Sequence, residues 1–430
     1  MLPPRPLVFF TLFVLALGAA SAAAELRVEL EPPDLEEIAR ADALRASIGR
    51  VAHFAVTRSL DIDPLAQTHG VWDRRTGETV LWRLEVRSPG ARTLSLAFDT
   101  FELPPGARLE IGVPGGARLR PLVRADRTDN GTLWTPTLAG DTLQLALRVP
   151  IEHLDVLDLH LTAVQHGYAG FGGDDPPFGT CQPDVACREL EPTWQEVGRS
   201  VGLLTVDGVR FCSGFLLNNT AVDERPLFLT AKHCGVRPDN ADSVVVRWNV
   251  HPRTCGGAAS PERRIGSFSL GARVLASDTA TDFVLLELDH PVDRRHGVRF
   301  AGWSRSALPP QRTVSVHHPQ ATAQKIAVDY DAPRPTRHLE RRARRHADHW
   351  MVRAWEVGST EGGSSGAPLF DERGLAVGWL HGGHAACGNR EPDWFGRLAA
   401  AWDGPTPETR LRDWLDPAET YAVSLQPLEP

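Results

Sequence analysis

All six cysteines of this 430-residue chain lie in one stretch, which begins at Cys181 and ends at Cys387. In a protein that is exported from the cell, an even set of cysteines confined to one region predicts disulfides, here three. A zinc site fits poorly, because no two cysteines have the Cys-x-x-Cys spacing. Spacing alone leaves the pairing open. The chain therefore divides into a cross-linked second half and a first half that must fold without cross-links.

Residues 1–24 predict the export. Arg5 supplies a positive start, Leu7–Leu17 an apolar core, and Ala20–Ala24 a zone of small residues for cleavage. The apolar run is shorter than a membrane span requires. We therefore expect a secreted protein, extracellular or periplasmic, with a retained membrane anchor as the alternative.

Residues 25–165 contain short runs of alternating polarity, such as Val80–Val86, Leu94–Phe98 and Leu143–Val149. Turn signals rich in glycine, proline and asparagine separate these runs, a pattern typical of a small β-sandwich. The region lies between the signal peptide and the cysteine-rich half. We interpret it as a propeptide that assists folding or masks the site, or else as an accessory domain that binds substrate.

Residues 166–180 are rich in glycine, aspartate and proline and are expected to form a linker and a site of maturation cleavage. No lysine or arginine lies between Arg148 and Arg188. A protease that cuts only after lysine or arginine therefore cannot cut inside this linker. Either a protease of another specificity makes the maturation cut, or a cut after a basic residue occurs at Arg148 instead.

Residues 181–430 contain many runs of β-branched and apolar residues joined by long polar loops. This pattern favours two antiparallel β-barrels over an α/β fold. Helix is expected mainly near the end of the chain, around Pro407–Leu415. We thus predict an all-β fold, with a double barrel preceded by a sandwich.

Ser365 lies in the segment Glu361–Pro368, between glycines that allow the backbone to approach a bound carbonyl group. The N–H groups of Gly363 and Ser365 would be free to bind an oxyanion. Taken alone, such a segment is more often an ordinary loop. A serine hydroxyl needs a base, and the base needs a third group that orients it.

His233 and Asp282 supply these groups, since His233 follows an apolar strand and Asp282 precedes another. The order His, Asp, Ser is that of the chymotrypsin-like proteases. The competing residues, which we interpret as surface, turn or core residues, are His251, His317, His318, Asp278 and Asp289. His346 and His349 have a spacing that suits a metal site on a helix. Because nothing completes a ligand set there, we interpret them as part of a solvated basic loop.

The second half of the chain resembles the secreted bacterial lysyl endopeptidases, a branch of the chymotrypsin-like serine proteases. Besides the three segments above, the matching stretches are Cys212–Thr220, Ala301–Trp303, Val316–Pro319, Leu380–Gly383 and Leu411–Pro417. The resemblance implies that Ser365, and not Ser364, is the nucleophile. It also implies the disulfides Cys181–Cys387, Cys187–Cys255 and Cys212–Cys234.

The resemblance further implies a pocket for a basic side chain. Trypsin's acidic position, six residues before the nucleophile, is Ser359 here, whereas Asp393–Arg397 matches the Asp-aromatic-aromatic-Gly-Arg string of the family. Asp393 would then bind a cationic substrate side chain, with Glu361 as the second candidate. His381 and Gly382 would line the pocket. The family stacks its histidine on a tryptophan, for which residues 334–349 offer no clear counterpart.

These features predict a serine endopeptidase that cuts after basic residues, preferably lysine, because such specificity would spare the arginine-rich segment Arg341–Arg345. Alternatives are a protease with another preference and an inactive binding protein that keeps the fold. The net charge of −8 gives no reason to expect nucleic acid or an anionic membrane as partner. We expect protein or peptide substrates, a monomer, and neither metal nor cofactor, since acid–base transfer and oriented N–H groups suffice for acyl chemistry.

Overall fold

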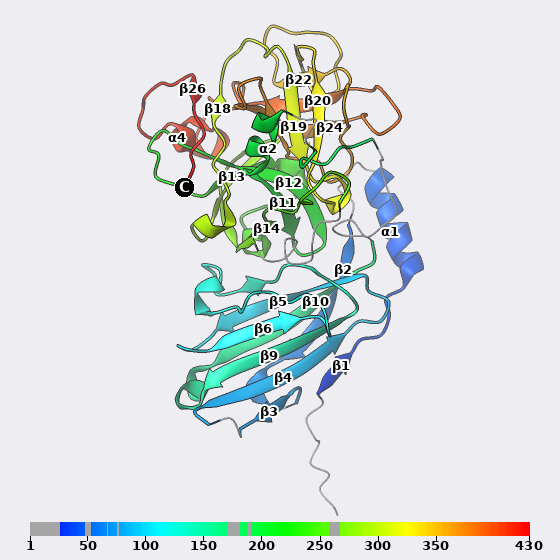
Figure 1. Cartoon of the computed structure of the whole chain (residues 1–430), viewed down its shortest axis with the longest axis vertical. Helices are drawn as coiled ribbons and strands as arrows, with labels where there is room; N and C mark the ends of the chain where they lie inside the picture. The colour runs from blue at the N-terminus through cyan, green and yellow to red at the C-terminus, as the bar shows by residue number, and fades with distance from the viewer. Residues whose placement is uncertain are drawn as a thin grey trace, which may run out of the picture.

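The structure is a computed structural model that describes residues 26–47, 53–66, 68–74, 77–169, 181–187, 191–257 and 267–430. The predicted signal peptide and most of the predicted linker lie outside the described residues. The expectation of an all-β fold is confirmed, and Figure 1 shows the blue and cyan strands of the first half next to the green to red strands of the second.

The first half contains two five-stranded sheets that share one core. One sheet has the order β1-β4-β9-β6 with β3 on β4, and the other has the order β2-β10-β5-β7 with β8 on β5. Trp82 and Leu147 from the first sheet and Phe98 from the second are at most 1% exposed and lie in the same cluster. The strands are β1 (Arg27–Glu29), β2 (Ala55–Ile62), β3 (Val71–Asp73), β4 (Thr79–Arg87), β5 (Thr93–Glu102), β6 (Arg108–Gly112), β7 (Leu133–Trp134), β8 (Leu138–Ala139), β9 (Thr142–Pro150) and β10 (Asp158–Gly167).

Helix α1 (Leu35–Ser47) lies between strands β1 and β2 of the sandwich and was not predicted from the sequence. Asp34 caps its first turn, since its Oδ1 accepts the N–H groups of Glu36 and Glu37 at 2.9 and 3.1 Å. The Tyr168 hydroxyl donates to Asp42 at 2.7 Å and so ties the helix to the end of the sandwich.

The sandwich packs directly on the second half of the chain. Val245, Phe268 and Leu270 of strands β14 and β15 belong to the sandwich core. Phe54, which immediately precedes β2, packs on Phe211 with ring centroids 5.8 Å apart. Nε2 of His290 lies 2.9 Å from the carbonyl oxygen of Arg127 and also joins the two parts.

Two larger sheets build the second half, and their strands are those of the predicted double barrel. The first has the order β15-β14-β11-β12-β13-β17-β16 and is antiparallel throughout. The second has the order β20-β19-β23-β24-β25-β22-β21, with β18 pairing with β24 and β26. The first sheet comprises β11 (Val201–Val206), β12 (Arg210–Leu217), β13 (Leu227–Ala231), β14 (Val245–Arg247), β15 (Phe268–Leu270), β16 (Ala272–Asp278) and β17 (Phe283–Leu288). The second comprises β18 (Trp303–Ser304), β19 (Thr313–His317), β20 (Lys325–Asp329), β21 (Arg334–Thr336), β22 (His349–Val352), β23 (Pro368–Phe370), β24 (Ala376–Gly383), β25 (Asp393–Arg397) and β26 (Ser424–Leu425).

Aromatic side chains join these two sheets. Phe283 of β17 contacts Trp379 of β24 edge to face at 5.7 Å, and Nε1 of Trp379 donates to the carbonyl oxygen of Thr281 at 2.9 Å. This shared aromatic core fixes the two sheets relative to each other. It therefore also fixes the loops that leave both sheets on the same side.

Helices are few in the second half. The predicted C-terminal helix is present in short form as α4 (Arg412–Leu415), preceded by a 3₁₀ turn at Pro407–Thr409. Helix α2 (Pro192–Gly198) was not predicted, although Pro192 at its first position is a typical start signal. None of the helices in the described residues is long and apolar enough to cross a membrane.

Three disulfides cross-link the second half, and they join Cys181 to Cys387, Cys187 to Cys255 and Cys212 to Cys234. These are the pairs that the family resemblance implies. The last pair closes the segment that carries His233 onto strand β12.

Candidate active site

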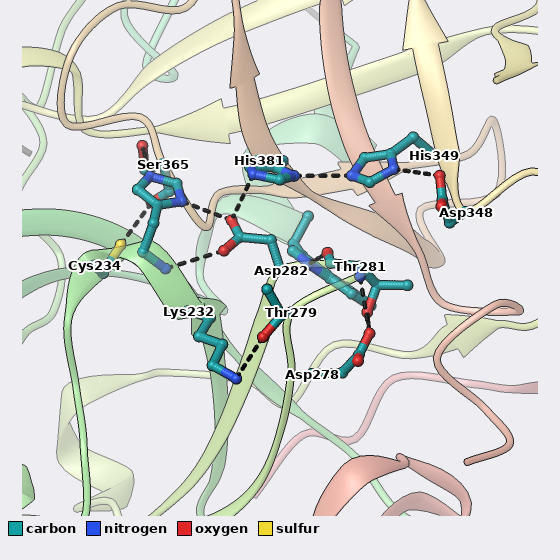
Figure 2. Close-up of polar contacts among 12 residues, drawn as sticks. Lys232, Cys234, Asp278, Thr279, Thr281, Asp282, Asp348, His349, Ser365 and His381 are labelled. Carbon is teal, nitrogen blue, oxygen red and sulfur yellow. Dashed lines mark hydrogen bonds and ion pairs between the residues drawn. The ribbon is translucent and has the colours of Figure 1, made fainter. Parts of the chain in front are cut away.

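His233, Asp282 and Ser365 meet where the two sheets of the second half face each other. Nε2 of His233 lies 2.8 Å from Oγ of Ser365, and its Nδ1 lies 2.6 Å from Oδ2 of Asp282. The backbone N–H of His233 also donates to Oδ1 of Asp282 at 3.0 Å. The three predicted side chains therefore form one continuous hydrogen-bonded chain, and Figure 2 shows Ser365 and Asp282 within it.

Asp282 is held by a strained turn ahead of β17. It has φ of 59°, a left-handed conformation that a non-glycine residue adopts at a cost of about 1 kcal/mol or more. Oδ2 of Asp278 accepts both the N–H and the hydroxyl of Thr281 at 2.8 Å, which fixes the preceding residue. Asp278 was considered as a competing triad residue, and here it supports the turn. Asp282 itself is 5% exposed, so its carboxylate is directed at His233 and away from water.

The loop before Ser365 directs its N–H groups outward because its carbonyl groups are held from behind. Ser213 donates its hydroxyl to the carbonyl oxygen of Gly363 at 3.0 Å and its N–H to that of Ser365 at 2.9 Å. Among the described residues, the N–H groups of Gly363 and Ser365 form no backbone hydrogen bond. Gly363 has φ of 92°, and a Cβ there would lie 2.4 Å from the ring of Phe211, so only glycine fits. The arrangement leaves two donors free for an anion.

Asp393 lies at the start of β25 and is 1% exposed. Its Oδ2 accepts hydrogen bonds from Nε1 of Trp355 at 2.8 Å and from the hydroxyl of Thr360 at 2.6 Å. Burial raises the pKa of Asp393, although these two hydrogen bonds act in the opposite direction. Within the described part of the chain, no lysine or arginine forms an ion pair with this carboxylate. The carboxyl group of Asp393 is thus buried without a lysine or arginine partner among the described residues.

His381 extends the triad on the far side of Asp282. Its Nε2 lies 3.6 Å from Oδ2 of Asp282, and its ring is stacked near that of His233, with centroids 5.8 Å apart. The ring of His338 stacks on His381 at 3.6 Å with an angle of 10° between the planes. Residues 334–349 therefore do offer a stacking partner. This partner, His338, is a histidine and not a tryptophan. Inspection of the sequence for a tryptophan therefore could not identify it.

A model of the lysyl endopeptidase C-terminal domain matches residues 178–396, which is half of the chain. The chain belongs to the lysyl endopeptidase family. Lysyl endopeptidase of Pseudomonas aeruginosa is 27% identical over 308 residues, which cover 64% of this chain and 63% of that protein. The match thus spans less than two thirds of the relative's length.

Solved structures similar to this member of the lysyl endopeptidase family include human heparin binding protein and a serine endoprotease from Yersinia pestis. The first is 20% identical, covers 52% of this chain and 92% of its own, and has a TM-score of 0.36. The second is 17% identical, covers 49% and 62%, and has a TM-score of 0.33.

The interpretation of His349 as part of a solvated loop is wrong for this lysyl endopeptidase family member. His349 opens strand β22, pairs in register with Gly396 of β25, and has a side chain that is 0% exposed. His346, in contrast, is exposed. The two histidines were interpreted as parts of one loop, whereas the chain enters strand β22 between them.

The remaining competitors lie away from the reacting atoms. His317 and His318 are fully buried core residues, His251 is half-buried, and Asp289 accepts the N–H of Asp129 from the sandwich at 3.0 Å. Glu361 is half-buried, and its N–H donates to the Ser364 hydroxyl.

Two groups in the described residues bring three metal-ligating side chains within 4.8 Å of one another. One is His233, Asp282 and His381, which is the site itself. The other is Asp329, Asp331 and Glu356, at the end of β20. Acidic groups of this kind are also common where no ion binds, so the second group alone assigns no metal.

Proposed function

We propose that this chain is a secreted serine endopeptidase that cuts peptide bonds after basic residues, preferably lysine. The observation that carries the proposal is the continuous chain from Ser365 through His233 to Asp282, with contacts of 2.8 and 2.6 Å. Such a chain makes a hydroxyl nucleophilic at neutral pH.

In the proposed reaction, Oγ of Ser365 attacks the carbonyl carbon of the substrate while Nε2 of His233 takes the hydroxyl proton. Asp282 accepts the N–H at Nδ1 and stabilises the imidazolium. The oxyanion binds the N–H groups of Gly363 and Ser365. His233 then gives its proton to the leaving amine, and water repeats the sequence on the acyl-enzyme. Neither a metal nor a cofactor takes part in these steps.

Asp393 is proposed to select the substrate. Its buried carboxyl group accepts hydrogen bonds from the neutral side chains of Trp355 and Thr360, and a lysine side chain would supply a cation. A neutral side chain would leave the charge unpaired, which is unfavourable by several kcal/mol (about 3–5). His381 and Gly382 would form the adjoining wall. Gly382 has φ of 148° and open space where a Cβ would project, so the backbone there can approach a substrate.

The sandwich of residues 25–165 is proposed to act as a propeptide, with residues 1–24 as signal peptide and 166–180 as linker. It packs on β14, β15 and Phe211, and it leaves the side chain of His233 30% exposed. The described part of the sandwich therefore does not bury the proposed base, which favours a role in folding over simple blockage. We propose a monomer that acts on proteins and peptides outside the cell.

The test is digestion of a denatured protein mixture by the matured chain, with new termini read by mass spectrometry. We expect cuts after lysine, and Ser365→Ala should remove them while leaving the fold intact. Cuts after both lysine and arginine would support the proposed protease activity and show that the pocket accepts either basic side chain. No cuts by folded, matured protein would overturn the proposal in favour of the binding-protein alternative.

A further inference from the structure

Two aspartates of the second half face the sandwich at one point of the contact between them. Asp289 directly follows β17, and its Oδ2 accepts the N–H of Asp129 from the sandwich at 3.0 Å. Asp242 lies in a 3₁₀ turn, Ala241–Ser243, and its Oδ2 accepts the hydroxyl of Thr132 at 3.0 Å. Both carboxyl groups thus bind donors of the sandwich.

The sandwich covers the carboxyl group of Asp289. Gly271 lies so close to it that a Cβ on this glycine would be 2.2 Å from Oδ2 of Asp289. The same Cβ would be 2.7 Å from the methyl group of Thr128, a sandwich residue that is 1% exposed. The carboxyl group is therefore enclosed between the turn at Gly271 and the sandwich, and separation of the two halves would expose it to water.

The contact brings three carboxyl groups together, those of Asp129, Asp242 and Asp289. Among the described residues, none of the three forms an ion pair with a lysine or an arginine. Arg127, from the same sandwich segment as Asp129, pairs with Glu102 of the sandwich instead. Negative charge at this contact is therefore not balanced by a permanent cation.

Two basic groups lie at the same contact. Nε2 of His290 lies 2.9 Å from the carbonyl oxygen of Arg127, and the charge of a protonated His290 would favour ionisation of Asp289. Arg120 of the sandwich lies over the ring of Phe268 at 4.6 Å and pairs with a sandwich carboxylate, that of Asp126. Of these two, only the histidine gains or loses its charge between acid and neutral pH.

The enclosure makes Asp289 harder to ionise. Burial raises the pKa of Asp289 above 3.8, its ordinary value, and the charges of Asp129 and Asp242 act in the same direction. The N–H of Asp129 and the charge of His290 oppose this rise without cancelling it. Separation of the sandwich admits water and removes the charge of Asp129, so the carboxyl group then ionises more easily. Attachment is thus most favourable in acid and weakens as the pH rises through the raised pKa.

We infer that Asp289 makes the attachment of the cut sandwich sensitive to pH: the two pieces hold together in acid and separate more readily at neutral and alkaline pH. The partner is the sandwich of this same chain, through the segment that carries Asp129 and Thr132. The inference rests on the proposed role of the sandwich as a propeptide. It does not depend on the proposed chemistry at Ser365.

The experiment uses the full chain with Ser365→Ala, to prevent self-digestion, and with a recognition sequence for an unrelated protease inserted in the linker. After the cut, light scattering over a range of protein concentrations measures the Kd of the two pieces at pH 5, 6, 7 and 8. We expect the Kd to be several-fold higher at pH 8 than at pH 5. A return to pH 5 should restore the complex, which shows that both pieces stay folded.

Three variants identify the group that titrates. Asp289→Asn should give the same Kd at all four pH values, because asparagine does not ionise. Asp403→Asn, at a side chain of the second half that is 75% exposed, is the matched control and should keep the pH dependence. His290→Gln should keep it as well, which separates the aspartate from the neighbouring histidine. A constant Kd in the parent would overturn the inference, as would a pH dependence that persists unchanged in Asp289→Asn.

A second measurement needs no separation of the pieces. In uncut Ser365→Ala protein with ¹³C-labelled aspartate carboxyl groups, NMR should find that the signal removed by Asp289→Asn titrates above the ordinary range of aspartate. Asp129→Asn, which keeps the N–H but removes the charge, should move this titration to lower pH. An ordinary titration of Asp289 would overturn the inference even if the cut pieces never separate. An inactive parent would instead overturn the proposed protease function and leave both measurements unaffected.

Discussion

The hydroxyl of Ser364 lies 2.7 Å from Nδ1 of His317, and both side chains are fully buried. Burial lowers the pKa of His317 to about 3, so the ring is neutral when it forms this hydrogen bond with the Ser364 hydroxyl. Oγ of Ser364 in turn accepts the N–H of Glu361 at 3.1 Å. The residue beside the proposed nucleophile is therefore fixed by a neutral contact inside the domain, and the loop that directs the oxyanion donors is formed while the sandwich is attached.

Ser364→Ala should loosen this loop. The change leaves a buried imidazole nitrogen without its partner, and we expect a loss of about 1–3 kcal/mol in the free energy of unfolding. Because the N–H of Gly363 lies in the same loop, kcat should fall about 10-fold, less than the loss of an entire oxyanion donor. Steady-state kinetics, corrected by titration of intact Ser365 with a serine-directed phosphonate, measures the effect. An unchanged kcat would show that the loop keeps its shape without the contact.

Asp393→Asn should remove the preference for basic residues. Loss of the charge pair with the substrate should lower kcat/KM for a lysyl peptide by about 100-fold or more. Glu361→Gln is the matched control, since Glu361 was the second candidate for this role, and it should change kcat/KM little. A larger fall in kcat/KM for Glu361→Gln than for Asp393→Asn would assign recognition of the basic side chain to Glu361.

The Asp393→Asn variant should also be more stable than the parent protein at neutral pH. Burial raises the pKa of Asp393 in the folded chain, so the folded state loses stability relative to the unfolded state as pH rises and the carboxyl ionises. Asparagine carries no such charge. Tm measured by calorimetry should therefore be higher for Asp393→Asn at pH 7, and the difference should shrink in acid.

Asp329 predicts a second pH dependence, away from the site. Burial and the nearby Glu356 raise its pKa from 3.8 to about 7. Its contribution is most favourable below about pH 4 and is lost as pH rises toward 7, because ionisation is harder in the folded state. Asp329→Asn should gain stability at pH 8, by at most about 4 kcal/mol, and none at pH 4. Urea unfolding at pH 4 and pH 8 tests this, in the Ser365→Ala background to prevent self-digestion. The measurement is made with and without a calcium chelator, because Asp329 belongs to a cluster of three carboxyl groups. An equal effect at both pH values would contradict it.

Phe54→Ala should weaken the contact between the sandwich and the second half of the chain. Phe54 is 1% exposed and packs in a cluster with Leu203, Val209 and Phe211. Removing a buried phenylalanine ring costs about 3–5 kcal/mol. After cleavage in the linker, we expect the two pieces to separate on size-exclusion chromatography, whereas those of the parent co-elute. Val71→Ala, at an exposed sandwich position, is the control and should leave co-elution intact.

The strands and the triad positions could be predicted because each depends on local sequence. The apolar strand expected directly after Asp282 is β17 (Phe283–Leu288), and its apolar residues are buried on both faces. The helix α1 was missed because Leu35 and Leu44 are both 63% exposed and give no apolar stripe. Its acidic first turn and the Asp34 cap were the available signals.

The contact between His349 and His381 could not be predicted, because it depends on strand pairing. Nε2 of His349 lies 2.9 Å from Nδ1 of His381 only because β22 and β24 both pair with β25, which brings together residues 32 positions apart. His338 has no sequence signal that separates it from other loop histidines. The tertiary structure thus brings these three histidines together, whereas local motifs indicated His233, Asp282 and Ser365.

The positions of the disulfides determine how the two halves of the chain stay together after the linker is cut. Since no cysteine precedes Cys181, every disulfide lies on the C-terminal side of the predicted linker. Once the linker is cut, the sandwich is a reversible ligand, held by noncovalent contacts such as those of Phe54, Phe268 and Leu270 and that of His290 with Arg127. The fraction of the cleaved protein that still has the sandwich bound then depends on protein concentration. Dilution in the surrounding medium would by itself dissociate the two pieces, without any further cleavage.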